Sequence, residues 1–187
     1  ESTRVLGQLV ENVSGMGLEA FMKQRIFTPL GMNETFYTVP AGLRGRVATV
    51  HRQVEGRLVE SPNPPEISAP PKGDGGLHST AADYAKFIRL FLNAGRTPDG
   101  TQLVKAGTIR IMGEDQLGAV RVRLQEAVTP ALSAAFPLGA GLDGFGLGFQ
   151  VTANPGMPGL RSPGSLSWAG IFNTQFWIDP VRGVGGI

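Results

Sequence analysis

The C-terminal third of the chain consists of short apolar runs separated by glycine and proline. Runs at 146–151, 165–169, 174–178 and from Gly183 onward have the length and composition of β-strands. The segment 179–183 has the residue types of a turn and joins the last two runs. Strands that follow one another through short turns pair antiparallel, so this region predicts an antiparallel meander. Any fold proposed for the chain must therefore contain such a sheet.

The N-terminal part has helical periodicity instead. Residues 3–14 place an apolar stripe on one helix face and end at Ser14-Gly15. That stripe consists of Val5, Leu6, Leu9, Val10 and Val13. A second short helix is predicted over 18–27, with Leu18, Phe21, Met22 and Ile26 facing inward.

A third helix has the clearest pattern. Thr80 and Asp83 resemble a capping box at its start, and Asn93-Ala94-Gly95 has the residue types of a helix end. Its predicted buried stripe is Tyr84, Phe87, Ile88, Phe91 and Leu92. Residues 105–113 predict a fourth helix.

The segments outside these helices, up to residue 143, are of three kinds. Residues 47–53 and 57–60 predict a small β-hairpin around Glu55-Gly56, and the proline-rich stretch after it predicts ordered coil within one domain. Residues 114–143 stay open: 120–124 alternate as a strand would, whereas 125–135 fit either a helix or a strand.

Composition narrows the class of protein. The chain has 187 residues, of which 41% are hydrophobic, so it is long enough for one domain with a core. The formal charge of +2 is spread among scattered basic residues, which argues against a nucleic-acid partner. No cysteine is present, which excludes thiolate catalysis and disulfides, and no apolar run is long enough to span a membrane.

The two ends predict an incomplete domain. A helix begins almost at Glu1, and the last residues enter an apolar strand that stops. We therefore expect residues 1–187 to be a single-domain fragment. The compartment stays open between cytoplasmic and periplasmic or secreted, because any signal peptide would precede Glu1.

The usual catalytic and cofactor motifs are missing from the chain or lack their context. No serine is followed three residues later by lysine, no G-x-S-x-G occurs, and neither Tyr37 nor Tyr84 has asparagine two residues on. Residues 139–144 match G-x-G-x-x-G, but a strand-like run follows where a nucleotide site needs a helix. His51 and His78 are too few for a metal site. We therefore expect neither a metal nor an organic cofactor.

The most informative segment lies near the C-terminus. Trp168-Ala169-Gly170 falls in a predicted strand and is followed by the aromatic run Phe176-Trp177-Ile178-Asp179-Pro180. Alone, this pattern also fits a purely structural hairpin in which both tryptophans belong to the core.

Three segments in this order resemble the β-lactamase-related serine hydrolases. They are residues 13–15 with 26–32, residues 75–83 (Gly-Gly-Leu-His-Ser-Thr-Ala-Ala-Asp), and Trp168-Ala169-Gly170 with its continuation. The resemblance covers the C-terminal half of such an enzyme and implies an α/β (α+β) fold of the β-lactamase/transpeptidase type, with an antiparallel sheet flanked by helices. It also implies that the nucleophile and base, a Ser-x-x-Lys pair, lie upstream of Glu1.

The same resemblance assigns roles to individual residues. Trp168-Ala169-Gly170 takes the place of the family's Lys-Thr-Gly or His-x-Gly triplet, so these three residues are candidate substrate contacts. The backbone N–H of Ile171 is then the candidate oxyanion donor. Gly75, Gly76 and His78 complete the expected substrate-binding set, since Gly-Gly allows close approach of backbone.

One departure from the family pattern bears on the substrate. Trp168 stands where a cationic residue would hold a substrate carboxylate, so an apolar acyl or alcohol group is favoured. We expect a carboxylesterase acting on a small-molecule ester or amide, with the isolated chain inactive. The alternatives are a non-catalytic binding member of the fold and a β-lactamase or D-Ala-D-Ala carboxypeptidase; the oligomeric state stays open.

Overall fold

A computed structural model describes residues 2–61, 70–127, 135–137, 139–153, 161–170 and 172–187. The fold is mixed, with helices and antiparallel sheets, as the sequence predicted. The chain divides into two compact units, Glu1–Lys86 and Phe87–Ile187, whose boundary falls within helix α4. The prediction that all 187 residues form one domain stays a prediction.

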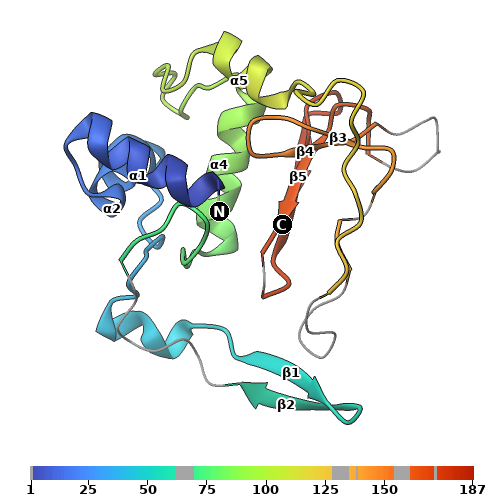
Figure 1. The fold of residues 1–187 in the computed structure, drawn as a ribbon. Coiled ribbons are helices and arrows are strands. Elements are labelled where there is room, and N and C mark those ends of the chain that lie inside the picture. The colour runs from blue at the N-terminus through green and yellow to red at the C-terminus, as the bar shows by residue number, and fades with distance from the viewer. Residues whose placement is uncertain (1, 62–69, 128–134, 138, 154–160, 171) are drawn as a thin grey trace. The chain divides into compact units, whose positions relative to one another are not determined.

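The elements of the first unit are mainly helical (Figure 1). They are α1 (Ser2–Ser14), α2 (Leu18–Met22), the π-helix η1 (Lys23–Phe27), α3 (Thr28–Leu30), the 3-10 helix η2 (Ala41–Arg46), β1 (Val50–Val54), β2 (Arg57–Ser61) and the start of α4 (Ala81–Leu92). The predicted second helix continues beyond residue 27, through the π turn into α3, and ends at Gly31 in the left-handed region with φ 67°. Its buried residues are Leu18, Phe27 and Leu30.

Helix α1 is present as predicted, but its apolar stripe does not form a buried face. Val5, Leu6, Leu9 and Val13 are each more than half exposed. The helix packs instead through Gly7, whose absent Cβ would lie 2.9 Å from the backbone nitrogen of Gly73. Periodicity predicted the helix correctly, but the glycine contact decides which face packs.

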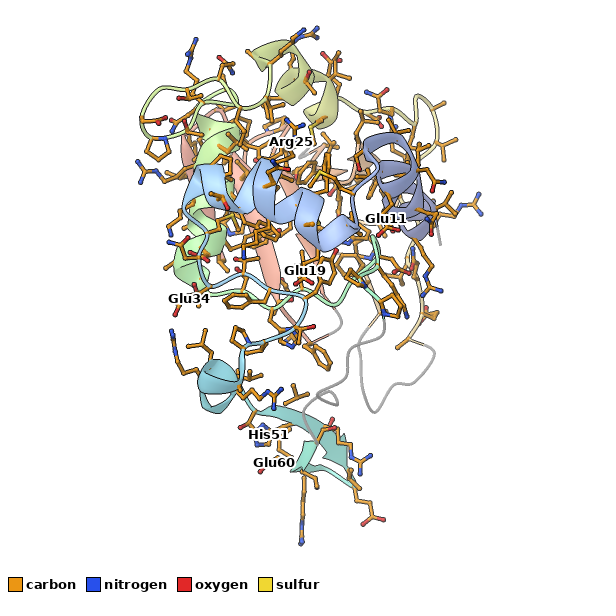
Figure 2. All side chains as sticks on the ribbon, turned by 90° about the vertical axis from the view of Figure 1, so that its left-hand side faces the viewer. Glu11, Glu19, Arg25, Glu34, His51 and Glu60 are labelled. Atoms are coloured by element: carbon orange, nitrogen blue, oxygen red, sulfur yellow. The ribbon has the colours of Figure 1, made fainter. Side chains whose placement is uncertain are left out.

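The hairpin forms as predicted. β1 pairs antiparallel with β2 around Glu55 and Gly56, both of which have positive φ, as a type I′ turn requires. Figure 2 shows His51 and Glu60 together on this hairpin, where they face each other across the strands. Nearly all of the hairpin's residues are exposed.

The second unit contains the predicted meander. Its elements are the remainder of α4, α5 (Ala106–Gly113), β3 (Gly144–Phe145), β4 (Gln150–Val151), β5 (Leu166–Ala169), β6 (Gln175–Asp179) and β7 (Val184–Gly186). The five strands are antiparallel in the order β3-β4-β5-β6-β7. β5 is therefore the central strand.

The core of this unit joins helix α4 to the sheet through aromatic rings. Phe91 meets Phe87 and Phe149 edge to face, at centroid distances of 5.1 and 5.0 Å, and Phe149 meets Phe176 at 6.1 Å. Ile88 of α4 lies against Gly185 of β7, where a Cβ would come within 2.6 Å of Ile88 Cγ2. These contacts fix α4 on the sheet that carries β5.

One prediction in this unit needs correction, and one open question is answered. The run 146–151 is not one strand: residues 146–149 form a tight turn between β3 and β4, with Gly148 at φ 93° and Gly146 donating to the carbonyl of Phe149. Residues 120–124 are not a regular strand, although Val122 donates to the carbonyl of Asp143 at 2.9 Å. The open question about 125–135 falls mostly on 128–134, outside the described residues.

Candidate functional site

Strand β5 continues past the end of its neighbour β4. β4 pairs with Leu166 and Ser167 only, so residues 168–170 have no partner from β4. On the other side β6 pairs with the whole strand, and Gly170 donates to the carbonyl of Thr174 at 2.7 Å. We call the side of residues 168–170 that faces away from β6 the open edge of β5.

The open edge presents the backbone of Ala169. Successive residues of a strand direct their N–H and C=O groups to opposite sides. Because Gly170 bonds to β6, Ala169 directs both groups away from β6. Among the described residues, Ala169 makes no backbone hydrogen bond on that side. A carbonyl or amide group of a ligand can therefore pair with this backbone.

Trp168 stands beside the open edge in an aromatic cluster. Its ring meets those of Phe136 and Phe145 edge to face, with centroid distances of 5.1 and 5.2 Å and interplanar angles of 89° and 82°. The side chain is half-buried. Two perpendicular ring contacts hold the indole in one orientation, so Trp168 forms a rigid apolar wall.

Gly170 ends the strand at a turn. Asn173 adopts φ 60° there and donates its backbone N–H to the carbonyl of Gly170 at 3.0 Å. A Cβ on Gly170 would lie 2.4 Å from Thr174 Oγ1. The glycine thus keeps the turn tight and leaves bare backbone at the end of the strand. Ile171, the predicted oxyanion donor, lies outside the described residues.

Substituting Gly170 by alanine tests this packing. We expect G170A to lower the free energy of unfolding by about 1–2 kcal/mol, because the new Cβ overlaps Thr174 Oγ1. T174A removes that oxygen and leaves the next atom 3.8 Å away. The double variant G170A/T174A should therefore recover most of the loss relative to T174A alone, as measured by urea unfolding. Additive losses would show that another contact causes the effect.

Gly75, Gly76 and His78 lie in the first unit. Gly75 and Gly76 have φ of 156° and 98°, and Gly76 packs on the ring of Tyr37. His78 forms an antiparallel bridge with Phe36, with N···O distances of 2.8 and 2.9 Å, and its Nδ1 is buried without a hydrogen-bond partner among the described residues. Their role in substrate binding stays a prediction.

Gly73 is a more constrained glycine that the sequence reading passed over. A Cβ there would lie 2.1 Å from the carbonyl oxygen of Thr3. The adjacent Asp74 pairs with Arg4 at 3.1 Å. The loop that leads into Gly75-Gly76 is therefore held against α1 by backbone contact.

The predicted capping box at α4 forms in half only. The backbone N–H of Asp83 donates to Thr80 Oγ1 at 3.2 Å. The Asp83 carboxylate, only 3% exposed, accepts instead from the Glu34 N–H, Thr35 Oγ1 and Lys86 Nζ, at 2.7, 3.0 and 2.8 Å. Burial alone would raise the pKa of Asp83, but these hydrogen bonds outweigh burial and lower it. Asp83 therefore secures the loop before residue 36 to the helix.

Burial keeps both tyrosines in the neutral phenol form near neutral pH, which argues against either acting as a phenolate base. Burial raises the pKa of Tyr84 to about 12. Burial also raises the pKa of Tyr37, helped by the nearby carboxylates of Glu19, Asp74 and Glu11. The Tyr37 hydroxyl donates to the carbonyl of Lys72 at 3.0 Å, which is a structural role.

Other kinds of site are not found in the described part of the chain. No group of three or more His, Cys, Asp or Glu side chains in that part could hold a metal ion. No helix within the described ranges has the length and apolar character of a membrane span. Residues 139–144 form a turn that leads into β3, as the sequence predicted, and not into a helix.

Sequence reasoning proposed Trp168, Ala169 and Gly170 as substrate contacts, which stays a prediction, and it did not predict their surroundings. Phe136 and Phe145 reach Trp168 from segments 32 and 23 residues earlier (168 − 136 and 168 − 145). In the sequence, these two residues are apolar side chains next to proline or glycine, and nothing there links them to Trp168. The open edge has no sequence signal of its own, because it follows from the short length of β4.

Comparisons with known proteins agree on one family. The family described as "Beta-lactamase" matches residues 2–187. Penicillin-binding protein 4 of Amycolatopsis lactamdurans is 33% identical over 62% of this chain and 31% of its own length. Lovastatin esterase of Penicillium rubens is 29% identical over 97% of this chain and 47% of its own length.

Among solved structures, simvastatin synthase from Aspergillus terreus (LovD6 mutant) has a TM-score of 0.73 at 20% identity. The similarity covers 97% of this chain and 46% of the synthase. This likeness shows the fold. The chain spans less than half the length of the curated relatives it matches.

Proposed function

The chain belongs to the beta-lactamase family, whose members are serine hydrolases, and on this premise we propose that it supplies one wall of a carboxylic ester hydrolase active site. The observation that carries the proposal is the open edge of β5, which ends in the bare backbone of Gly170. Substrate lies along this edge and against Trp168. Acyl transfer to serine and then to water is the reaction.

The proposed chemistry has two steps. A serine oxygen attacks the ester carbonyl carbon, and the alcohol leaves with a proton. Water then cleaves the acyl-enzyme, which releases the carboxylic acid and restores the serine. The N–H of Ile171 donates to the developing oxyanion, a contact whose loss costs about 3 kcal/mol of barrier.

The proposed nucleophile lies outside residues 1–187, since these contain no Ser-x-x-Lys. In this proposal the longer protein contributes the serine and its lysine base. The 187 residues contribute the strand, the aromatic wall and the oxyanion donor.

The choice of an ester rests on Trp168. The triplet offers no cation to a substrate carboxylate, and the rigid cluster with Phe136 and Phe145 favours an apolar acyl or alcohol group. Similarity to lovastatin esterase supports this choice. Similarity to penicillin-binding protein 4 keeps β-lactams and D-Ala peptides as the competing substrates.

A paired assay tests the proposal. The 187-residue chain should not hydrolyse p-nitrophenyl butyrate. The longer protein should hydrolyse it, and a serine-directed fluorophosphonate should add its phosphonyl group to that protein with loss of fluoride. The same preparation is tested with a chromogenic cephalosporin, which we expect to react more slowly. Unchanged mass and no turnover by the longer protein would instead identify a non-catalytic member. Serine-dependent turnover by the 187 residues alone would show that the nucleophile is misassigned.

A further inference from the structure

We propose that a hollow in the second unit binds an amphipathic monocarboxylate with a linear aliphatic chain, such as a medium-chain fatty acid. The hollow has a volume of ≈ 590 Å³ and is lined by residues 119–124 and 140–141. The hollow is largely open to solvent, and its volume falls within roughly 300–1,000 Å³, the range of small-molecule sites.

Backbone hydrogen bonds build the walls of the hollow. Gln116 N–H donates to the Phe145 carbonyl at 2.8 Å, and Gly141 N–H donates to the Val122 carbonyl at 2.8 Å. With the contact of Val122 to Asp143, these bonds hold residues 116–122 beside 141–145 as an irregular ribbon. The walls are therefore held by hydrogen bonds of the chain itself.

The lining favours an aliphatic ligand. Val120 and Leu124 are 60% and 53% exposed, which is high for such side chains, and Val122 lies between them. Ala140 and Gly141 complete the described lining, with Gly141 beside Val122. Since the described lining residues include no aromatic ring, a flexible alkyl chain fits better than a planar ring system.

The two arginines of the hollow differ in their hydrogen bonds and ion pairs. Arg121 is held by Asp115 Oδ2 at 3.1 Å and by the carbonyls of Gly118 and Val120 at 2.6 and 2.9 Å. Arg123 is exposed and forms no ion pair or hydrogen bond with the described residues. A planar guanidinium matches the two oxygens of a carboxylate, so Arg123 supplies the complementary charge.

This site is independent of the proposed ester hydrolysis. Its lining includes none of the three aromatic residues of the Trp168 cluster and no residue of the open edge. Binding can therefore be measured on the 187-residue chain, whether or not that chain belongs to an esterase.

Calorimetric titration tests the proposal with octanoate as the probe. Binding is expected for octanoate, with much weaker binding of butyrate and of the octyltrimethylammonium cation. R123Q should weaken octanoate binding roughly tenfold, the effect of losing one charge-assisted hydrogen bond. R57Q, which removes an exposed arginine from the hairpin, is the matched control and should bind as the wild type does.

A second variant keeps the test decisive if R123Q unfolds. V120D adds a carboxylate at an exposed position of the lining and should abolish octanoate binding while leaving the circular dichroism spectrum unchanged. Amide shifts in NMR spectra with octanoate should be largest at 119–124 and 140–141. Absence of binding at millimolar octanoate, equal binding by R123Q, or shifts centred elsewhere would overturn the proposal.

Discussion

Replacing Asp179 by alanine is expected to lower the free energy of unfolding of the second unit by about 3–5 kcal/mol. The carboxylate is 1% exposed and accepts three backbone N–H groups, those of Ser162, Val181 and Arg182, at 2.9, 3.1 and 3.0 Å. Alanine would leave these donors unpaired, in part away from water. Urea unfolding followed by tryptophan fluorescence measures the loss.

Asp99 provides the matched control for Asp179. It too accepts from a nearby backbone N–H, that of Thr101 at 3.1 Å, and from Thr97 Oγ1, but it lies in an exposed turn. Water can replace these bonds, so D99A should cost about 1 kcal/mol. Equal losses for D179A and D99A would show that burial of the Asp179 carboxylate does not matter.

The same carboxylate gives the second unit a predictable response to acid. Burial alone would raise the pKa of Asp179 above 3.8, but hydrogen bonds from Ser162, Arg182 and Val181 outweigh burial and lower the pKa. A group whose pKa is lower in the folded state stabilises the fold at neutral pH. That contribution is lost as pH falls below the ordinary value toward the folded pKa. The stability difference between wild type and D179A should therefore shrink below about pH 4.

Replacing Gly95 by alanine should destabilise the second unit by about 3–5 kcal/mol. Gly95 ends α4 at φ 84°, where its N–H donates to the carbonyl of Leu90 at 2.7 Å. An added Cβ would lie 1.9 Å from the carbonyl oxygen of Val104. Two effects therefore add: the left-handed backbone of a residue with a side chain, and a collision with rigid backbone.

Gly100 separates these two effects. It has almost the same backbone angle, φ 87°, but open space where the Cβ would lie. G100A should therefore cost only the backbone penalty, about 1–2 kcal/mol. The difference between G95A and G100A in urea unfolding measures the collision with Val104. A difference near zero would mean that the segment at Val104 moves aside easily.

Local sequence determined the positions and ends of most elements. The hairpin turn at Gly56 and the helix end at Gly95 depend on glycines, which tolerate positive φ. The strands at 166–169, 175–179 and 184–186 follow from apolar runs bounded by turn residues. Each of these features depends on the conformational preferences of a few neighbouring residues, so it can be predicted from the local sequence.

Tertiary contacts decided what sequence periodicity left undetermined. The apolar stripe of α1 is exposed because Gly7 meets Gly73 by backbone contact, which no hydrophobicity pattern encodes. The run 146–151 divides at a turn that contacts a distant segment, where Leu147 donates its backbone N–H to the carbonyl of Met112 at 3.0 Å. Asp83 leaves its predicted capping role because Glu34 and Thr35 offer donors from a distant loop.

The candidate site shows the same division. Trp168-Ala169-Gly170 was identified from the sequence, since the order of three motifs is specific to a family. The aromatic neighbours of Trp168, and the lack of a backbone partner for Ala169 among the described residues, came only from the fold. The physical reason is the sequence distance over which each feature is determined. Residue preferences and turns act over a few positions. An aromatic wall forms where distant segments meet, and an open edge forms where one strand extends beyond its neighbour.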